Sequence, residues 1–170
     1  MKLPVRLQGG RIATPLGELT ALVDEAGRLT RLAFPEEVQS HRWRVEADAI
    51  HWNQPAVRPV AAQIDAYFAG RRRDFDLDLA PAGTDFQQSV WRALQQIPHG
   101  TILTYGQFAA QLGFPKAARA IGAANGANPI SLIIPCHRLI GSSGSLVNYA
   151  GGLAVKRGLL TWEGALPAGT

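Results

Sequence analysis

The spacing of hydrophobic residues changes along the chain and predicts two regions of different structure. In the first region, residues 11–34 carry loosely alternating apolar positions with turn sequences at 14–17 and 25–27, which predicts β-strands. Apolar residues then recur on one helical face over 54–68, so we expect a helix there. An alternating run over 74–79 predicts one more strand.

In the second half of the chain the pattern is helical and carries explicit start signals. Thr84 and Thr104 are each followed three residues later by a glutamine, the capping-box arrangement that begins a helix. The second of these helices ends at Gly113, and a third follows over 116–125. Two short helices joined by a turn that contains glycine and proline predict a helix-turn-helix motif.

The last part of the chain holds an apolar run, a loop and a helix. Residues 130–134 are all apolar or small, which predicts a buried strand or extended segment, and 141–152 form a loop rich in glycine and serine. The complete pattern is that of an α/β protein. It predicts a small N-terminal α/β domain over residues 1–80 and a mostly helical domain over 84–166.

Charge is distributed unevenly between these two regions. Before Thr84 there are 11 basic and 11 acidic residues, and from Thr84 onward there are 6 basic and 2 acidic residues. The net charge of +4 therefore belongs entirely to the second region. A basic domain suggests a polyanionic partner, although an unevenly charged solvated surface explains this count equally well.

The composition excludes several classes of protein. Cys136 is the only cysteine, so the chain forms no internal disulfide and no cysteine-rich zinc site. His41, His51 and His99 lack the spacing of metal ligands, and we expect no metal. A lone cysteine suits a reducing compartment, and no apolar stretch approaches the length of a membrane span. A cytoplasmic location is the expectation.

The second helix of the predicted motif is built almost entirely from alanine and glycine. A helix that reads the major groove usually carries several long polar side chains, and this one has only Arg119 beyond its first residue. A smooth helix suits the narrow minor groove, where Arg119 could enter the base stack. From composition alone, a small-residue helix packed in a core with Arg119 at its rim is the stronger interpretation.

Cys136 is followed directly by His137 and Arg138. A thiol with an ordinary pKa of about 8.5 is mostly protonated at neutral pH, so nucleophilic chemistry needs a base or a positive charge nearby. His137 would reach the sulfur only through a turn or a bridging water. Glu163 is the candidate acid to orient His137. For a cysteine next to a histidine alone, an inert buried thiol is the commoner case.

Several ordered sequence blocks change this balance, because together they resemble the O6-alkylguanine-DNA alkyltransferases, also called methylated-DNA–protein-cysteine methyltransferases. The resemblance covers about residues 84–166 at high specificity and extends more loosely over the N-terminal half. The specific blocks are Thr104-Tyr105-Gly106, Ala117-Ala118-Arg119-Ala120-Ile121-Gly122, Gly126-Ala127-Asn128-Pro129-Ile130, Pro135-Cys136-His137-Arg138 and Asn148-Tyr149-Ala150-Gly151-Gly152.

The resemblance implies a fold and a mode of binding. It implies a ribonuclease-H-like N-terminal domain and a winged helix-turn-helix domain that binds double-stranded DNA through the minor groove, as a monomer, with cooperative binding left open. The damaged guanine is flipped out of the duplex, and Arg119 fills its place. By the same resemblance, Tyr105 assists flipping and donates to the guanine N3, and Asn128 ties the helix-turn-helix to the nucleophile. Ser142 lies near the DNA backbone, and Tyr149 and Ala150 wall the pocket.

The resemblance also implies direct-reversal DNA repair by a suicidal methyltransferase. Cys136 attacks the alkyl carbon on guanine O6, His137 takes the thiol proton through a water, and Glu163 orients His137. O4-alkylthymine is expected to react less well. The thioether product is not hydrolysed, so each molecule acts once, and no cofactor is needed. Relatives with cysteine zinc ligands differ from this chain, and some members have serine where Ala150 stands.

Two other functions remain to be weighed. A non-catalytic binder of alkylated DNA would not need Cys136, whose presence argues against it. A helix-turn-helix regulator that senses alkylation through Cys136 would need a second module, and the sequence shows no such module.

Overall fold

The computed structural model describes residues 6–166, so the first five residues of the expected N-terminal domain lie outside it. Contacts divide the chain into two compact units, with the division between Ala82 and Gly83. The two units are described separately below.

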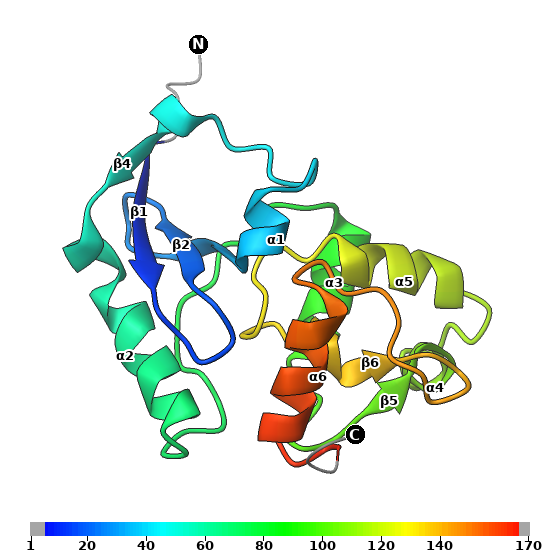
Figure 1. Cartoon of the computed structure of the whole chain (residues 1–170). Helices are drawn as coiled ribbons and strands as arrows, with labels where there is room; N and C mark the ends of the chain where they lie inside the picture. The colour runs from blue at the N-terminus through cyan, green and yellow to red at the C-terminus, as the bar shows by residue number, and fades with distance from the viewer. Residues whose placement is uncertain (1–5, 167–170) are drawn as a thin grey trace. The chain divides into compact units, whose positions relative to one another are not determined.

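The N-terminal unit is built on a four-stranded sheet with the strand order β3-β2-β1-β4 (Figure 1). Strand β1 (Leu7–Ile12) pairs antiparallel with β2 (Leu19–Val23), and β2 pairs antiparallel with β3 (Leu29–Ala33). Strand β4 (Ile50–Trp52) pairs parallel with β1. The predicted turns join the antiparallel strands, and each contains a glycine with positive φ, a conformation that costs glycine little.

Helices cover this sheet and complete its core. Besides the main helix α2 (Arg58–Phe68), the unit has the short helices α1 (Pro35–Val38), η1 (Ala47–Ala49) and η2 (Gln54–Val57). Helix α2 buries the face that the hydrophobic spacing indicates, and the residues on it are Val60, Ile64 and Tyr67. Burial of such apolar side chains contributes about 1.5–3 kcal/mol each.

The predicted strand over 74–79 is wrong. Only an isolated bridge joins Leu79 to Leu29, and the backbone of Asp76 bonds instead to the side chain of Gln63. The Gln63 amide donates to the Asp76 carbonyl at 2.7 Å and accepts from its N–H at 2.8 Å. A side chain from α2 therefore satisfies backbone groups that a neighbouring strand would otherwise bond, and this substitution is invisible in the hydrophobic spacing.

The second unit is mostly helical. Its elements are α3 (Asp85–Leu94), β5 (Leu103–Thr104), α4 (Tyr105–Gln111), α5 (Ala118–Gly126), η3 (Cys136–Arg138), β6 (Leu139–Ile140) and α6 (Leu153–Trp162). Both predicted capping boxes are present, because Thr84 and Gln87 bond reciprocally, as do Thr104 and Gln107. Helices α4 and α5 form the helix-turn-helix, and β5 pairs parallel with β6.

The segment over 130–134 is buried as expected, but it is not a strand. It forms a turn in which Ile134 N–H donates to the Ile130 carbonyl, and Leu132 has a φ of 72°. A positive φ is uncommon for a residue with a branched side chain, so the surrounding packing must impose it. Apolar spacing alone does not distinguish a buried turn from a buried strand.

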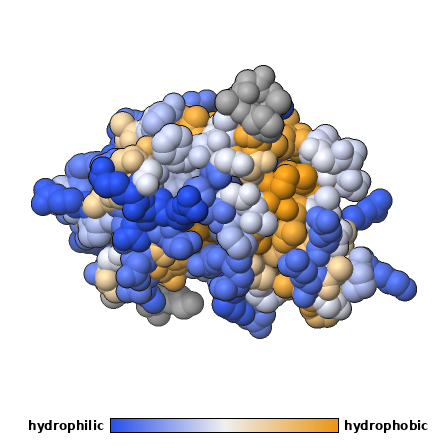
Figure 2. All heavy atoms as spheres, turned by 90° about the horizontal axis from the view of Figure 1, so that it is seen from below, coloured by the Kyte–Doolittle hydropathy of each residue, from blue (hydrophilic) through white to orange (hydrophobic). Residues whose placement is uncertain are grey.

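Figure 2 shows one face of the molecule, on which hydrophilic side chains predominate and hydrophobic ones gather in a smaller area. Among residues 6–166, no helix is both long enough and apolar enough to cross a lipid bilayer.

Candidate active site

A single turn of 3-10 helix, η3, holds Cys136, His137 and Arg138, and all three side chains are buried. A 3-10 helix has three residues per turn, so successive side chains point about 120° apart rather than to opposite sides of an extended strand. This turn therefore removes the opposite orientation of the two side chains that an extended segment would impose on Cys136 and His137. It also follows Pro135, which restricts the backbone at the entry to the turn.

The side chain of Asn128 fixes the approach to this turn. Its Oδ1 accepts from Ile130 N–H at 2.9 Å, and its Nδ2 donates to the carbonyls of Ile134 at 2.9 Å and Ile130 at 3.3 Å. Asn128 lies two residues beyond the end of α5. It therefore connects the helix-turn-helix to the buried turn that precedes Cys136.

The two nitrogens of the His137 imidazole differ in their contacts. Nε2 lies 3.0 Å from Oε1 of Glu163, whereas no group among residues 6–166 partners the buried Nδ1. Burial lowers the pKa of His137 despite the opposing effect of Glu163, so the ring is neutral at neutral pH. A carboxylate only accepts, so the proton lies on Nε2, and Nδ1 presents a lone pair.

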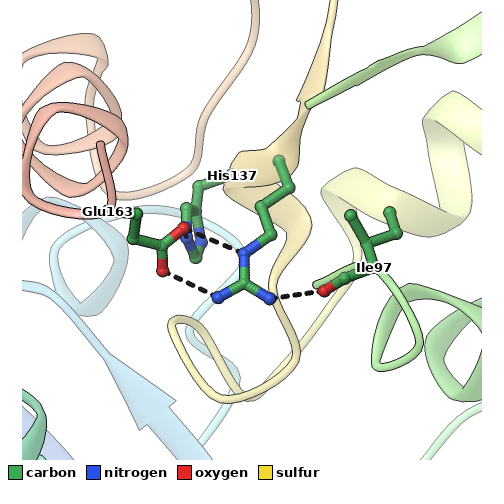
Figure 3. A network of polar contacts seen from close by, with 4 residues as sticks. Ile97, His137 and Glu163 are labelled. Atoms are coloured by element: carbon green, nitrogen blue, oxygen red, sulfur yellow. Dashed lines mark hydrogen bonds and ion pairs between the residues drawn. The ribbon is translucent and has the colours of Figure 1, made fainter. Parts of the chain in front are cut away.

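Arg138 also bonds Glu163, with two hydrogen bonds to its carboxylate (Figure 3). Its Nε and Nη2 donate to the two carboxylate oxygens at 2.9 and 2.8 Å, and its Nη1 donates to the Ile97 carbonyl at 2.6 Å. Burial alone would raise the pKa of Glu163, but the hydrogen bonds and charges of Arg138 and His137 outweigh it. The pKa of Glu163 is held well below its ordinary value, and the carboxylate stays ionised.

Tyr105, the first residue of α4, lies close enough to Cys136 for the charge of that residue to affect its pKa. Burial raises the pKa of its phenol, the charge of Cys136 raises it further, and a hydrogen bond from Asn125 opposes both. The hydroxyl is therefore protonated at neutral pH. Asn125 donates from Nδ2 to the Tyr105 oxygen at 3.5 Å and to the Cys136 carbonyl at 3.4 Å.

Lys156 in α6 is completely buried, which is rare for lysine. Its Nζ donates to the carbonyl of Leu139 at 2.6 Å and to that of Val147 at 2.9 Å, so it ties β6 to the following loop. Burial lowers the pKa of Lys156 to about 8, while the charge of Cys136 raises it. A cation that interacts with Cys136 favours the thiolate over the thiol.

The remaining predicted residues lie at the surface or half-buried, outside this buried cluster. Arg119 and Ser142 are exposed, and Tyr149 and Ala150 are half-buried in the loop before α6. Helix α5 is compatible both with packing in a core and with an exposed binding face. One of its faces is buried, and the other carries Arg119 among small side chains. On the buried face, Trp91 Nε1 donates to the Ala124 carbonyl at 2.8 Å.

Sequence reasoning missed three polar residues of this cluster: Arg138, Asn125 and Lys156. Arg138 stands in a recognised block, and its burial was the missing information. The only signal for Lys156 and Asn125 is a polar residue at a helical position whose neighbours three and four residues earlier are apolar or small. Among residues 6–166, no group of three or more His, Cys, Asp or Glu residues is placed to hold a metal ion.

Comparison with known proteins identifies both units. Residues 85–165 match the family model of the DNA-binding domain of 6-O-methylguanine DNA methyltransferase, and residues 10–81 match its ribonuclease-like domain. The chain is 46% identical to the methylated-DNA–protein-cysteine methyltransferase of Salmonella typhimurium, over 95% of this chain and 98% of the relative. It is 47% identical to that of Methanosarcina barkeri, over 89% and 94%.

A solved structure extends the likeness to three dimensions. The crystal structure of Mycobacterium tuberculosis OGT in complex with DNA matches with a TM-score of 0.83 and 43% sequence identity, over 92% of each chain. These matches confirm the predicted fold class of an N-terminal α/β domain followed by a helical DNA-binding domain. The chain belongs to the methylated-DNA–protein-cysteine methyltransferase family.

Proposed function

We propose that this protein repairs DNA by direct reversal, moving the alkyl group of O6-alkylguanine onto its own Cys136. The observation that carries the proposal is the state of His137. It is a neutral imidazole that Glu163 anchors at Nε2, with an unshared lone pair at Nδ1, one residue from a buried thiol. This is the arrangement that activates a nucleophile.

The chemistry follows from these groups. A water between Cys136 and Nδ1 of His137 would pass the thiol proton to the ring, and the ionised Glu163 would stabilise the imidazolium that forms. The electron pair of the Cys136 sulfur forms the new bond to carbon as the bond from carbon to O6 breaks. Guanine leaves as an anion, and the protonated hydroxyl of Tyr105 is the donor proposed for its N3. Because the product thioether is not hydrolysed, each molecule reacts once. Transfer from O4-alkylthymine is less efficient in this proposal.

The binding part of the proposal rests on α4, α5 and the loop before α6. The exposed face of α5 would approach the minor groove of double-stranded DNA, with Arg119 holding the place of the flipped base. Tyr149 and Ala150 would line the base pocket, Asn128 would hold the nucleophile's segment, and Ser142 would contact the backbone. We further propose a cytoplasmic protein that acts as a monomer without a metal or cofactor.

Mass spectrometry tests this proposal directly. The protein is incubated with duplex DNA containing one O6-methylguanine, and its intact mass and modified peptide are then determined. We expect one added methyl group, located on Cys136, with unmodified DNA and the Cys136→Ser variant as controls. Binding without methyl transfer would instead support a non-catalytic damage binder.

A further inference from the structure

Asn125 is a buried amide in α5 that contacts both the nucleophile's backbone and the phenol of Tyr105. We propose that Asn125 is a positioning residue. It takes no part in bond making or breaking, and it holds the Tyr105 hydroxyl with its hydrogen directed at the departing guanine. This inference rests on the proposed function, because it assigns the residue that prepares Tyr105 for that function.

The orientation of the amide follows from the Cys136 carbonyl. A carbonyl oxygen only accepts, so the amide nitrogen of Asn125, and not its oxygen, must face Cys136 at 3.4 Å. The same nitrogen then faces the Tyr105 oxygen at 3.5 Å. Because the nitrogen has no lone pair to offer, Tyr105 accepts from it and keeps its own O–H hydrogen for another acceptor.

Packing alone does not account for an amide at this position. Oδ1 of Asn125 is buried, and no group within residues 6–166 partners it. A buried acceptor without a partner costs about 1–3 kcal/mol. An apolar side chain of the same size would fill the space without that cost, so the donors of Asn125 are what distinguish it.

The hydrogen bond from Asn125 also lowers the pKa of the Tyr105 phenol, which makes its hydroxyl a better donor. Burial and the charge of Cys136 both raise the pKa of Tyr105, and donation from Asn125 lowers it. Donation from Asn125 therefore makes the Tyr105 hydroxyl a stronger hydrogen-bond donor toward the departing guanine.

A double-mutant cycle tests the link between the two residues. Single-turnover rates of methyl transfer from duplex DNA are measured for the native protein, Asn125→Leu, Tyr105→Phe and the double variant. We expect Asn125→Leu to slow transfer about tenfold, the effect of one ordinary hydrogen bond. In the Tyr105→Phe background the same change should slow it less than about twofold, because the group that Asn125 positions is gone.

Two controls separate this role from a structural one. Alkylation of Cys136 by iodoacetamide releases no guanine, so its rate should be unchanged in Asn125→Leu. Gln95→Leu removes an exposed amide at the C-cap of α3, whose Nε2 donates to the Trp91 carbonyl, and it should leave both reactions unchanged. If Asn125→Leu does not fold, Asn125→Ser, which is smaller, takes its place in the cycle with the same expected pattern.

The outcomes are distinguishable from failure of the proposed function. Absence of methyl transfer by the native protein would refute that function and this inference together. Transfer that Tyr105→Phe leaves at the native rate would refute the inference alone. Equal slowing by Asn125→Leu in both backgrounds, or equal slowing of iodoacetamide alkylation, would also overturn it and assign Asn125 to Cys136 instead.

Discussion

At the scale of single residues, the site depends on one ionised carboxylate. Glu163 accepts from His137 and doubly from Arg138, and its own side chain is buried. A buried charge is tolerated only when its partners are complete. The same contacts set the proton on His137, so the stability of the unit and the protonation state of the base have a common origin.

Replacement of Glu163 by glutamine is expected to lower the free energy of unfolding at neutral pH by about 3–5 kcal/mol, since Arg138 is left buried without its counter-charge. Denaturant unfolding of the two proteins measures this difference. The control is Glu18→Gln, whose ion pair with Arg11 is more than half exposed and should contribute only about 0–1 kcal/mol. A similar loss in both variants would contradict the expectation.

The same residue predicts a pH dependence. The pKa of Glu163 is lower in the folded protein than its ordinary 4.5, so its stabilising contribution is complete above pH 4.5 and is lost as pH falls toward the folded value. Native protein should therefore lose stability below pH 4.5 more steeply than Glu163→Gln. Unfolding curves at pH 6, 4.5 and 3.5 measure the slopes, and parallel slopes would count against the prediction.

His137 should remain a neutral ring with its proton on Nε2 at pH values where an ordinary histidine is half protonated. Its pKa lies below the ordinary 6.5 because burial disfavours the charged ring. Nitrogen NMR of the imidazoles at pH 8 and pH 6 distinguishes the two nitrogens and their protonation. A histidine in a short unstructured peptide is the reference, because its pKa of about 6.5 lies between these values. A His137 signal that moves with it would refute this prediction.

At the scale of elements, α5 has two different faces. One face packs against α3 through the Trp91 hydrogen bond, and the ring of Tyr105 lies beside Gly122. A Cβ on Gly122 would lie 3.9 Å from that ring, which is ordinary contact. The other face exposes Arg119 among alanines. The small side chains of α5 therefore serve packing within the protein on one face and, as proposed, close approach to DNA on the other.

Arg119→Ala is expected to slow methyl transfer from duplex DNA by more than tenfold while slowing transfer from a free O6-alkylguanine base less than about twofold. The physical reason is that only the duplex reaction includes base flipping, which costs a few kcal/mol. Single-turnover rates on the two substrates measure the ratio. Because Arg119 is exposed, its removal should leave thermal stability unchanged. Equal slowing on both substrates would contradict an intercalating role for Arg119.

At the scale of the whole molecule, the residues of the site and the proposed DNA contacts all lie beyond Gly83, in the second compact unit. The N-terminal unit has its own sheet and buried core. The net positive charge also belongs to the second half of the chain. Stability of the first unit and chemistry in the second should therefore respond to different substitutions.

Gly10→Ala tests this separation. A Cβ on Gly10 would overlap the side chain of buried Val57 and lie 2.8 Å from Gln54 Oε1, so we expect a loss of about 1–3 kcal/mol in the N-terminal unit. Below its unfolding temperature the variant should transfer methyl groups at the native rate. Calorimetry and single-turnover kinetics measure the two quantities. A large fall in rate without unfolding would show that the N-terminal unit takes part in the reaction.

The sequence by itself determined the features that depend on neighbouring residues. Both capping boxes, the amphipathic face of α2 and the small-residue character of α5 are local patterns, and a local pattern is complete in the sequence. The motif blocks predicted Cys136 as the nucleophile for the same reason. The sequence also offered Glu163 as the acid for His137, but only as one of two acids in its domain.

The tertiary structure decided the features that join distant segments. Glu163 lies 26 residues from His137, and only folding determines whether they meet at 3.0 Å. Gln63 bonds the backbone of Asp76, in a segment where hydrophobic spacing predicts a strand. The partners of Asn125 and the burial of Lys156 are likewise absent from any local pattern. Spacing records which side chains avoid water, whereas hydrogen-bond partners and pKa values depend on groups that the chain brings together only when it folds.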